Sequence, residues 1–170
     1  MRTSIPRLFI VTDRQWSPRL AQLNESLTAT HPGWPVHFYD DAAALAFLKE
    51  RHGERAVQAF HGFESGAHRA DLFRYAVLHT LGGYYIDADN RPLVGLESVT
   101  QEQDFVSALH CLGWRPDQEK KRRRPSKGQG SCSMSIHNGF IAARPRSPLV
   151  ELLLRHMLSH PKPPRNVAGE

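Results

Sequence analysis

At 170 residues, with 40% hydrophobic and 23% charged residues, the chain has the length and composition of a single folded domain, which excludes intrinsic disorder. Its apolar runs are far shorter than the roughly 18 residues of a spanning helix, and the N-terminus lacks a signal-peptide apolar stretch, so we expect a cytoplasmic protein. The net charge of +5 permits an anionic partner, but much of the excess lies in the run Lys120–Arg124. The two cysteines, Cys111 and Cys132, indicate neither a zinc site nor a disulfide framework.

The first part of the chain alternates between predicted strands and helices. Leu8–Val11 is a short, bounded apolar run and predicts a buried strand. A helix follows, with Ser17 as its N-cap and leucines at helical spacing until His31. Val36–Tyr39 predicts a second strand, and a capped helix runs over residues 40–48. This order is typical of an α/β protein.

The rest of the chain continues the same alternation. Residues 66–81 have a helical apolar stripe, and Gly82-Gly83 ends that helix where left-handed backbone is needed. Later strands are predicted at residues 84–87, 105–109 and 139–143, and a last helix begins at Ser147. We therefore expect an α/β fold whose sheet is mainly parallel, with helices on its faces.

Two segments stand apart from this pattern. Residues 116–133 are polar, basic and glycine-rich, which predicts an exposed loop within one domain spanning residues 1–160. Residues 161–170 form a proline-rich tail. The loop is either a solvated insertion or a binding loop. A binding loop would contact the acceptor or an anionic surface, and the latter includes peripheral contact with a membrane.

Paired carboxylates are the main chemical signal. Asp87 and Asp89 fall at the carboxyl end of a predicted strand, where ligand crevices form in open α/β sheets. One intervening residue in a strand returns both side chains to the same side, so both could bind one cation. Carboxylate oxygens suit Mg²⁺ or Mn²⁺, which can neutralise a departing phosphate. An Asp-x-Asp triplet alone is a weak signal, so its context decides.

A second charged pair precedes the carboxylates. Asp71 and Arg74 lie three residues apart on a helix that is apolar on most sides. They form either a simple surface ion pair or a half-buried pair directed at a polar ligand. A carboxylate beside a guanidinium suits the hydroxyls of a sugar ring.

The segment Ala67–Tyr75 together with Gly82–Asp89 resembles the sugar-binding region of DXD-containing glycosyltransferases of family 32, and more distantly the clostridial glucosylating toxins. The shared pattern is Asp-x-x-Arg-Tyr, a helix, Gly-Gly-x-Tyr and Asp-x-Asp. Weaker similarity appears at Ile5-Pro6-Arg7, at Tyr39-Asp40-Asp41 and at His137–Ala143, so the likeness spans most of residues 5–158.

The resemblance implies a Rossmann-like GT-A fold and a role for Asp87 and Asp89 at the metal and the sugar diphosphate. It also implies that Asp71 and Arg74 hold the donor sugar, that Tyr85 lines the donor pocket, and that Asn138 belongs to the donor site. The implied activity is metal-dependent transfer of a sugar from a nucleotide-sugar to a hydroxyl of a glycan, lipid-linked or protein acceptor, with retention of configuration.

The chain also departs from the family. Ile10–Asp13 stands where the family has His and a base-stacking Trp, and Trp16 either replaces that contact or is an ordinary core or surface residue. The chain stops at Glu170, whereas family members extend further. Two alternatives therefore stay open: a catalytically inactive glycosyltransferase-like fragment, and a nucleic-acid-binding module that uses the basic run. Among the histidines, His137 beside Asn138 is the one to test.

Overall fold

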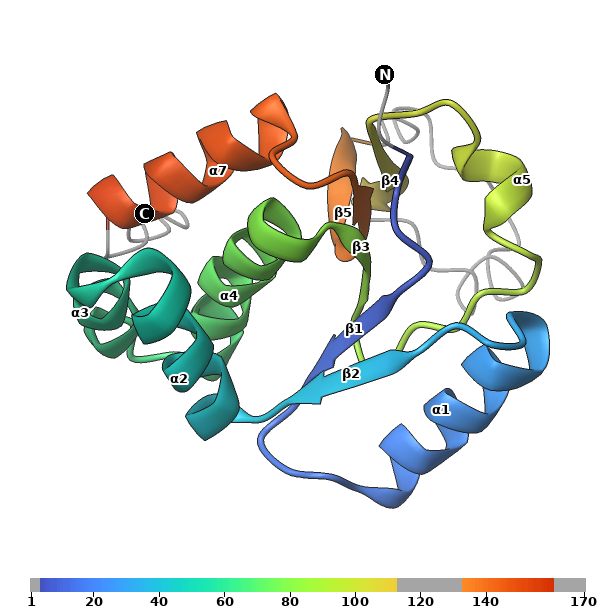
Figure 1. The fold of residues 1–170 in the computed structure, drawn as a ribbon, viewed down its shortest axis with the longest axis horizontal. Coiled ribbons are helices and arrows are strands. Elements are labelled where there is room, and N and C mark those ends of the chain that lie inside the picture. Colours follow the sequence, from blue (N-terminus) through green and yellow to red (C-terminus); the bar gives the residue numbers. More distant parts are fainter. Residues whose placement is uncertain (1–3, 113–132, 161–170) are drawn as a thin grey trace, which may run out of the picture.

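The computed structural model describes residues 4–112 and 133–160. They form a five-stranded sheet in the order β2-β1-β3-β5-β4, with helices on both faces (Figure 1). The strands are β1 (Phe9–Thr12), β2 (Val36–Tyr39), β3 (Gly83–Ile86), β4 (Phe105–Leu112) and β5 (Ser133–Ala143). The helices are α1 (Pro18–Thr30), α2 (Asp41–His52), α3 (Glu54–Gly62), α4 (Gly66–Leu81), α5 (Glu97–Thr100) and α7 (Pro148–Ser159).

The sheet is mixed, and the prediction of a mainly parallel sheet is wrong in this respect. Strand β1 runs parallel to β2 and to β3, but β5 runs antiparallel to both of its neighbours, β3 and β4. Strand direction depends on which strands pair in space, and an alternating pattern of strands and helices does not specify that pairing. The prediction of an α/β fold with flanking helices is confirmed.

Side chains of the central strands alternate between the two helical layers. Phe9 and Tyr84 face α1, whereas their neighbours Ile10 and Tyr85 face the layer built from α2, α3, α4 and α7. Figure 1 shows these two layers on opposite sides of β1. Both faces are therefore buried, which explains why β1 and β3 read as apolar runs without a polar alternation.

Local sequence signals set the ends of α2 and α4. The Asp40 carboxylate caps α2 by accepting a hydrogen bond from the Ala43 amide at 2.8 Å, and the Ser65 hydroxyl caps α4. At the other end of α4, Gly82 and Gly83 have φ angles of 67° and 104°. A Cβ on Gly83 would lie 2.7 Å from the Leu8 carbonyl oxygen, so glycine lets α4 turn directly into β3 against the chain that enters β1. The prediction of left-handed backbone at these glycines is confirmed.

Helix α3 was not predicted. It begins after Gly53, whose φ of 75° ends α2, and it buries Ala56, Ala59 and Phe60. Residues 116–132 of the predicted polar loop and the proline-rich tail at 161–170 lie outside the described residues. Within the described residues, no helix is long and apolar enough to cross a membrane.

Candidate functional site

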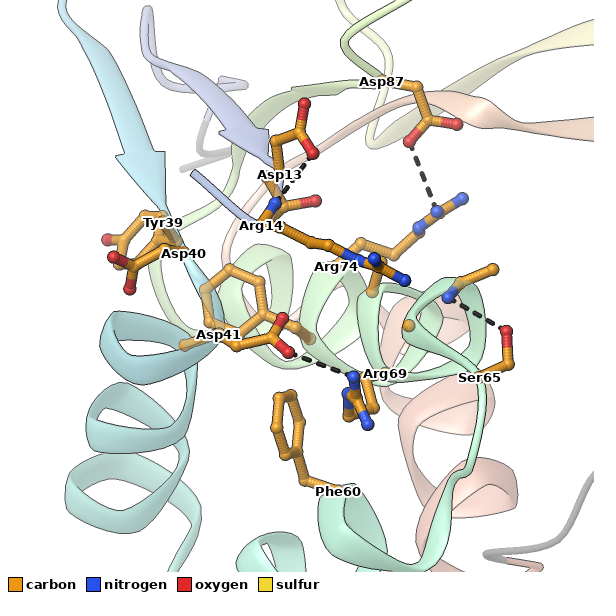
Figure 2. A pocket seen from close by; sticks show the side chains of 16 residues that line it. Asp13, Arg14, Tyr39, Asp40, Asp41, Phe60, Ser65, Arg69, Arg74 and Asp87 are labelled. Atoms are coloured by element: carbon orange, nitrogen blue, oxygen red, sulfur yellow. Dashed lines mark hydrogen bonds and ion pairs between the residues drawn. The ribbon is translucent and has the colours of Figure 1, made fainter. Parts of the chain in front are cut away.

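A cavity of about 470 Å³ opens at the carboxyl edge of the three parallel strands. The chain leaves β1, β2 and β3 there, next to the first turns of α2 and α4 (Figure 2). Crevices at this edge of an open α/β sheet are where such folds bind ligands. The lining residues are Thr12, Asp13, Arg14, Tyr39, Asp40, Asp41, Ala44, Phe60, Ser65, Gly66, Ala67, Arg69, Ala70, Phe73, Arg74 and Asp87.

Arg74 is the central cation of the site. It projects from the buried face of α4, and its side chain is 6% exposed. Its Nη2 lies 3.2 Å from Asp71 Oδ1 and 3.4 Å from Asp87 Oδ1, so one guanidinium group joins the carboxylate of α4 to the carboxylate that follows β3. Its Nη1 donates to the Asn138 carbonyl oxygen on β5. The structure thus brings together Asp71, Arg74 and Asp87, as well as the backbone of Asn138.

Tyr85 holds Asp87 through a hydrogen bond. The Tyr85 hydroxyl donates a 2.9 Å hydrogen bond to Asp87 Oδ1 and accepts one from Thr12 Oγ1 at 2.8 Å. The Arg74 guanidinium lies 4.6 Å from the centre of the Tyr85 ring. Tyr85 is fully buried, and it is not among the residues that line the cavity. From outside the cavity lining it contacts both Arg74 and Asp87.

Burial and neighbouring charges shift the pKa values of several groups in this cluster. Burial raises the pKa of the Asp71 carboxyl above its ordinary value, although the nearby Arg74 acts in the opposite direction. Burial alone would lower the pKa of Arg74, but Tyr85, Asp71 and Asp87 outweigh it and raise that pKa. Burial also raises the pKa of Tyr85 well above its ordinary value. At neutral pH the Tyr85 hydroxyl is therefore protonated and can donate to Asp87.

The Asp-Ala-Asp segment forms a turn after β3. The Asn90 amide donates to the Asp87 carbonyl at 2.9 Å, and the Asp87 amide donates to the Gly139 carbonyl on β5 at 2.8 Å. Asn90 Nδ2 donates to the same Gly139 carbonyl at 2.8 Å and lies 3.1 Å from His137 Nε2. The turn is consequently fixed to β5 by backbone and side-chain hydrogen bonds together.

Because Gly139 has no Cβ, the side chains of Asp87, Asn90 and His137 can come together beside it. An added Cβ would lie 2.8 Å from both Asp87 Oδ2 and His137 Nε2, and closer still to Asn90 Nδ2. Real Cβ atoms essentially never approach other atoms so closely, so a larger residue would push these groups aside. Gly139 and Asn90 were not proposed as site residues from the sequence. The position of Asn90 directly after Asp-Ala-Asp was the available signal.

Asp89 lies apart from this cluster. Because β3 ends at Ile86, the side-chain alternation of a strand does not extend to Asp89. Its carboxylate is 70% exposed and lies 3.6 Å from Arg19 Nη2 of α1, while Arg19 Nε donates to the Ala88 carbonyl at 3.0 Å. Asp89 does not line the cavity. The structure therefore places one of the two paired carboxylates at the cavity and the other at the solvent-exposed end of the turn.

The remaining predicted residues lie on or near β5 and β2. The exposed Asn138 side chain accepts a 3.3 Å hydrogen bond from the Tyr75 hydroxyl. Trp16 packs edge-on against Phe38 with ring centres 5.4 Å apart, and it does not line the cavity. A base-stacking role for Trp16 has no support from this position.

A second ion pair that lines the cavity was not predicted. Arg69 Nη2 lies 3.1 Å from Asp41 Oδ2, and its guanidinium stacks 5.7 Å from the centre of the Phe60 ring. This pair joins the first turns of α2 and α4 at the cavity. Asp41 belongs to the Tyr39-Asp40-Asp41 segment, whose similarity to the family is weak.

Comparison with known proteins agrees with this architecture. Residues 17–106, more than half of the chain, match the family model of the glycosyltransferase sugar-binding region containing the DXD motif. No curated protein matches the sequence.

Among solved structures, a chain described as PaToxG glycosyltransferase has a similar fold. The TM-score is 0.59 at 15% sequence identity, over 92% of this chain and 60% of that chain. This chain thus spans less than two thirds of that structure, and the likeness concerns the fold alone. The family resemblance inferred from the motifs is confirmed: the chain belongs to the family of glycosyltransferase sugar-binding regions that contain the DXD motif.

Proposed function

We propose that this domain transfers a sugar from a nucleotide-sugar to a hydroxyl acceptor in a reaction that depends on Mn²⁺ or Mg²⁺. The observation that carries the proposal is the joining of Asp71 and Asp87 by the buried Arg74 beside the 470 Å³ cavity. This arrangement combines a carboxylate and a guanidinium suited to sugar hydroxyls with an oxygen suited to a cation, at the edge where α/β folds bind nucleotides.

Asp71 and Arg74 are suited to hold the sugar of the donor. The Asp71 side chain is 26% exposed, so its carboxylate can accept hydrogen bonds from sugar hydroxyls while Arg74 fixes its orientation. Burial disfavours the charged form of Asp71 and raises its pKa. Carboxylates perturbed in this way are common at binding sites. Near this pair, the buried Tyr75 hydroxyl donates a hydrogen bond to the exposed Asn138 side chain on β5.

Asp87 is the residue that fits a divalent cation best. Its Oδ1 accepts hydrogen bonds from Tyr85 and Arg74, whereas its Oδ2 accepts none from the described residues. The exposed ion pair between Asp89 and Arg19 does not prevent Asp89 from contributing a second carboxylate, because such pairs contribute only about 0–1 kcal/mol. Mg²⁺ and Mn²⁺ accept one or two carboxylates together with substrate phosphates, so this oxygen set fits.

The bound cation would supply neutralisation of the charge on the departing nucleoside diphosphate. The chain itself would orient the donor: Tyr85 and Arg74 fix the Asp87 carboxylate, and Asp71 fixes the sugar ring. Retention of anomeric configuration is part of the proposal and rests on the family resemblance. The acceptor is a hydroxyl of a glycan, a lipid-linked sugar or a protein.

A thermal-shift panel tests the proposal. UDP- and GDP-sugars are added with and without MnCl₂, and a true donor at 100 times its Kd should stabilise the domain by about 2.7 kcal/mol. We expect Asp87→Asn to lose the metal-dependent part of the shift. Asp104→Asn is the matched control, because Asp104 forms a partly exposed ion pair with Arg144 outside the cavity. No shift with any donor would refute the proposal.

A further inference from the structure

The cavity wall carries more carboxylates than guanidinium groups. Asp13, Asp40, Asp41 and Asp87 line it together with three arginines, Arg14, Arg69 and Arg74. A nucleoside diphosphate brings further negative charge into this space. The proposed Mn²⁺ or Mg²⁺ would neutralise part of this charge, and an arginine whose charge is not already neutralised by a neighbouring carboxylate would neutralise more of it.

Two of the three arginines are already engaged. Arg74 is almost fully buried and contacts Asp71 and Asp87. Arg69 lies 3.1 Å from Asp41. To bind a phosphate, Arg74 would have to leave two partly buried carboxylates, which is costly. Arg69 would have to leave Asp41, whose side chain is 52% exposed, at a smaller cost.

Arg14 differs from both. Its side chain is exposed, lines the cavity and forms no ion pair with any residue that the structure describes. Its backbone, in contrast, is held: the Arg14 amide donates to Asp13 Oδ1 at 2.7 Å, and the Asp13 amide donates to the Tyr39 carbonyl at 3.4 Å. Figure 2 shows the Arg14 side chain extending from the end of β1 into the cavity. A fixed backbone thus presents an unpaired guanidinium group at the carboxyl edge of the sheet.

We propose that Arg14 binds the phosphates of the donor, an inference that rests on the proposed function. The planar guanidinium donates two parallel hydrogen bonds to phosphate oxygens, and no ion pair among the described residues has to break first. Arg14 acts from the β1 side of the cavity, and Asp87 acts from the β3 side. The two strands are neighbours in the sheet, so a diphosphate between them can reach both.

The test measures the binding of UDP and GDP, and of the matching nucleosides uridine and guanosine, by calorimetry with MnCl₂ present. Arg14→Gln should weaken diphosphate binding roughly tenfold or more, since hydrogen bonds to charged groups contribute that much, and should leave nucleoside binding unchanged. Arg14→Lys should recover part of the affinity, because it keeps the charge and loses the fork. Diphosphate binding by the wild type should also weaken more steeply with added salt than binding by Arg14→Gln.

Arg51→Gln is the matched control. Arg51 is an exposed arginine on α2 outside the cavity, so its loss changes the net charge equally without removing the proposed contact. Equal diphosphate affinities for Arg14→Gln and wild type, or equal losses in both variants, would overturn the assignment of Arg14. Wild-type protein that binds neither UDP nor GDP would instead overturn the proposed function and this inference with it.

Discussion

Replacing Gly139 with alanine tests whether the close approach beneath the Asp-Ala-Asp turn matters for the site. The new Cβ would lie 2.8 Å from Asp87 Oδ2 and from His137 Nε2, well inside the 3.4 Å at which ordinary contact begins. The ends of the Asp87 and His137 side chains can move. Asn90 Nδ2 would be closer still to the new Cβ, and moving it breaks its 2.8 Å hydrogen bond to the Gly139 carbonyl. Overpacking of this kind costs about 1–3 kcal/mol, which in a domain of this size lowers Tm by roughly 2–12 °C.

The more specific effect concerns Asp87. Because the added Cβ would displace Oδ2, which is the oxygen available to a cation, we expect Gly139→Ala to weaken Mn²⁺-dependent UDP or GDP binding by at least about tenfold, or about 1.4 kcal/mol. Binding and thermal unfolding are measured on the same samples. Gly95→Ala is the control, since a Cβ there would have no atom within 4 Å. If the two variants behave alike in both assays, the convergence at Gly139 does not position Asp87.

Four further substitutions probe the cluster and the turn that follows it. Asp71→Ala should weaken the binding of UDP- or GDP-sugars while leaving UDP and GDP affinities nearly unchanged, because only a sugar contact is lost; equal losses for both ligands would make the Asp71–Arg74 pair structural. Burial raises the pKa of Asp71 in the folded state, so wild type should gain stability relative to Asp71→Asn as the pH falls from neutral toward 3.8, measured as the difference in Tm between the two proteins. The opposite trend would contradict the pKa assignment. Tyr85→Phe removes the hydroxyl between Thr12 and Asp87 and should cost about 1–2 kcal/mol in urea unfolding, whereas an unchanged midpoint would show that these hydrogen bonds add nothing. Arg19→Ala should change stability by less than about 0.5 kcal/mol and leave metal-dependent donor binding intact, because its pair with Asp89 is exposed; a tenfold loss of binding would mean that the pair orders the turn.

Local sequence signals predicted most elements because those elements depend on local physics. Ser17-Pro18, Asp40 and Gly82-Gly83 specify helix ends through capping and backbone conformation, and the structure shows helix ends at each of them. The direction of β5 was not predictable in this way, because it depends on pairing with β3 and β4, which are distant in the sequence. Helix α3 was missed although Ala56, Ala59 and Phe60 have helical spacing.

The candidate site shows the same division between contacts set by local sequence and contacts between distant segments. The three-residue spacing of Asp71 and Arg74 predicted their pairing within one helix, and the structure places Arg74 Nη2 3.2 Å from Asp71 Oδ1. Contact of Arg74 with Asp87 and with the Asn138 backbone requires three separate elements to meet. The family pattern assigned these residues to the donor and metal sites but did not predict the contacts. The position of Asp89 depended on where β3 ends, a boundary that sequence patterns locate poorly.

Release of nucleoside diphosphate from a panel of UDP- and GDP-sugars tests the central claim most directly. The wild-type domain and Asp87→Asn are compared in MnCl₂ and in EDTA. The account predicts that wild type releases UDP or GDP from at least one donor when MnCl₂ is present, and that EDTA or the Asp87→Asn substitution reduces release to background without lowering the fraction of folded protein. Undiminished release in EDTA, or by Asp87→Asn, would contradict a metal-dependent transferase site centred on Asp87.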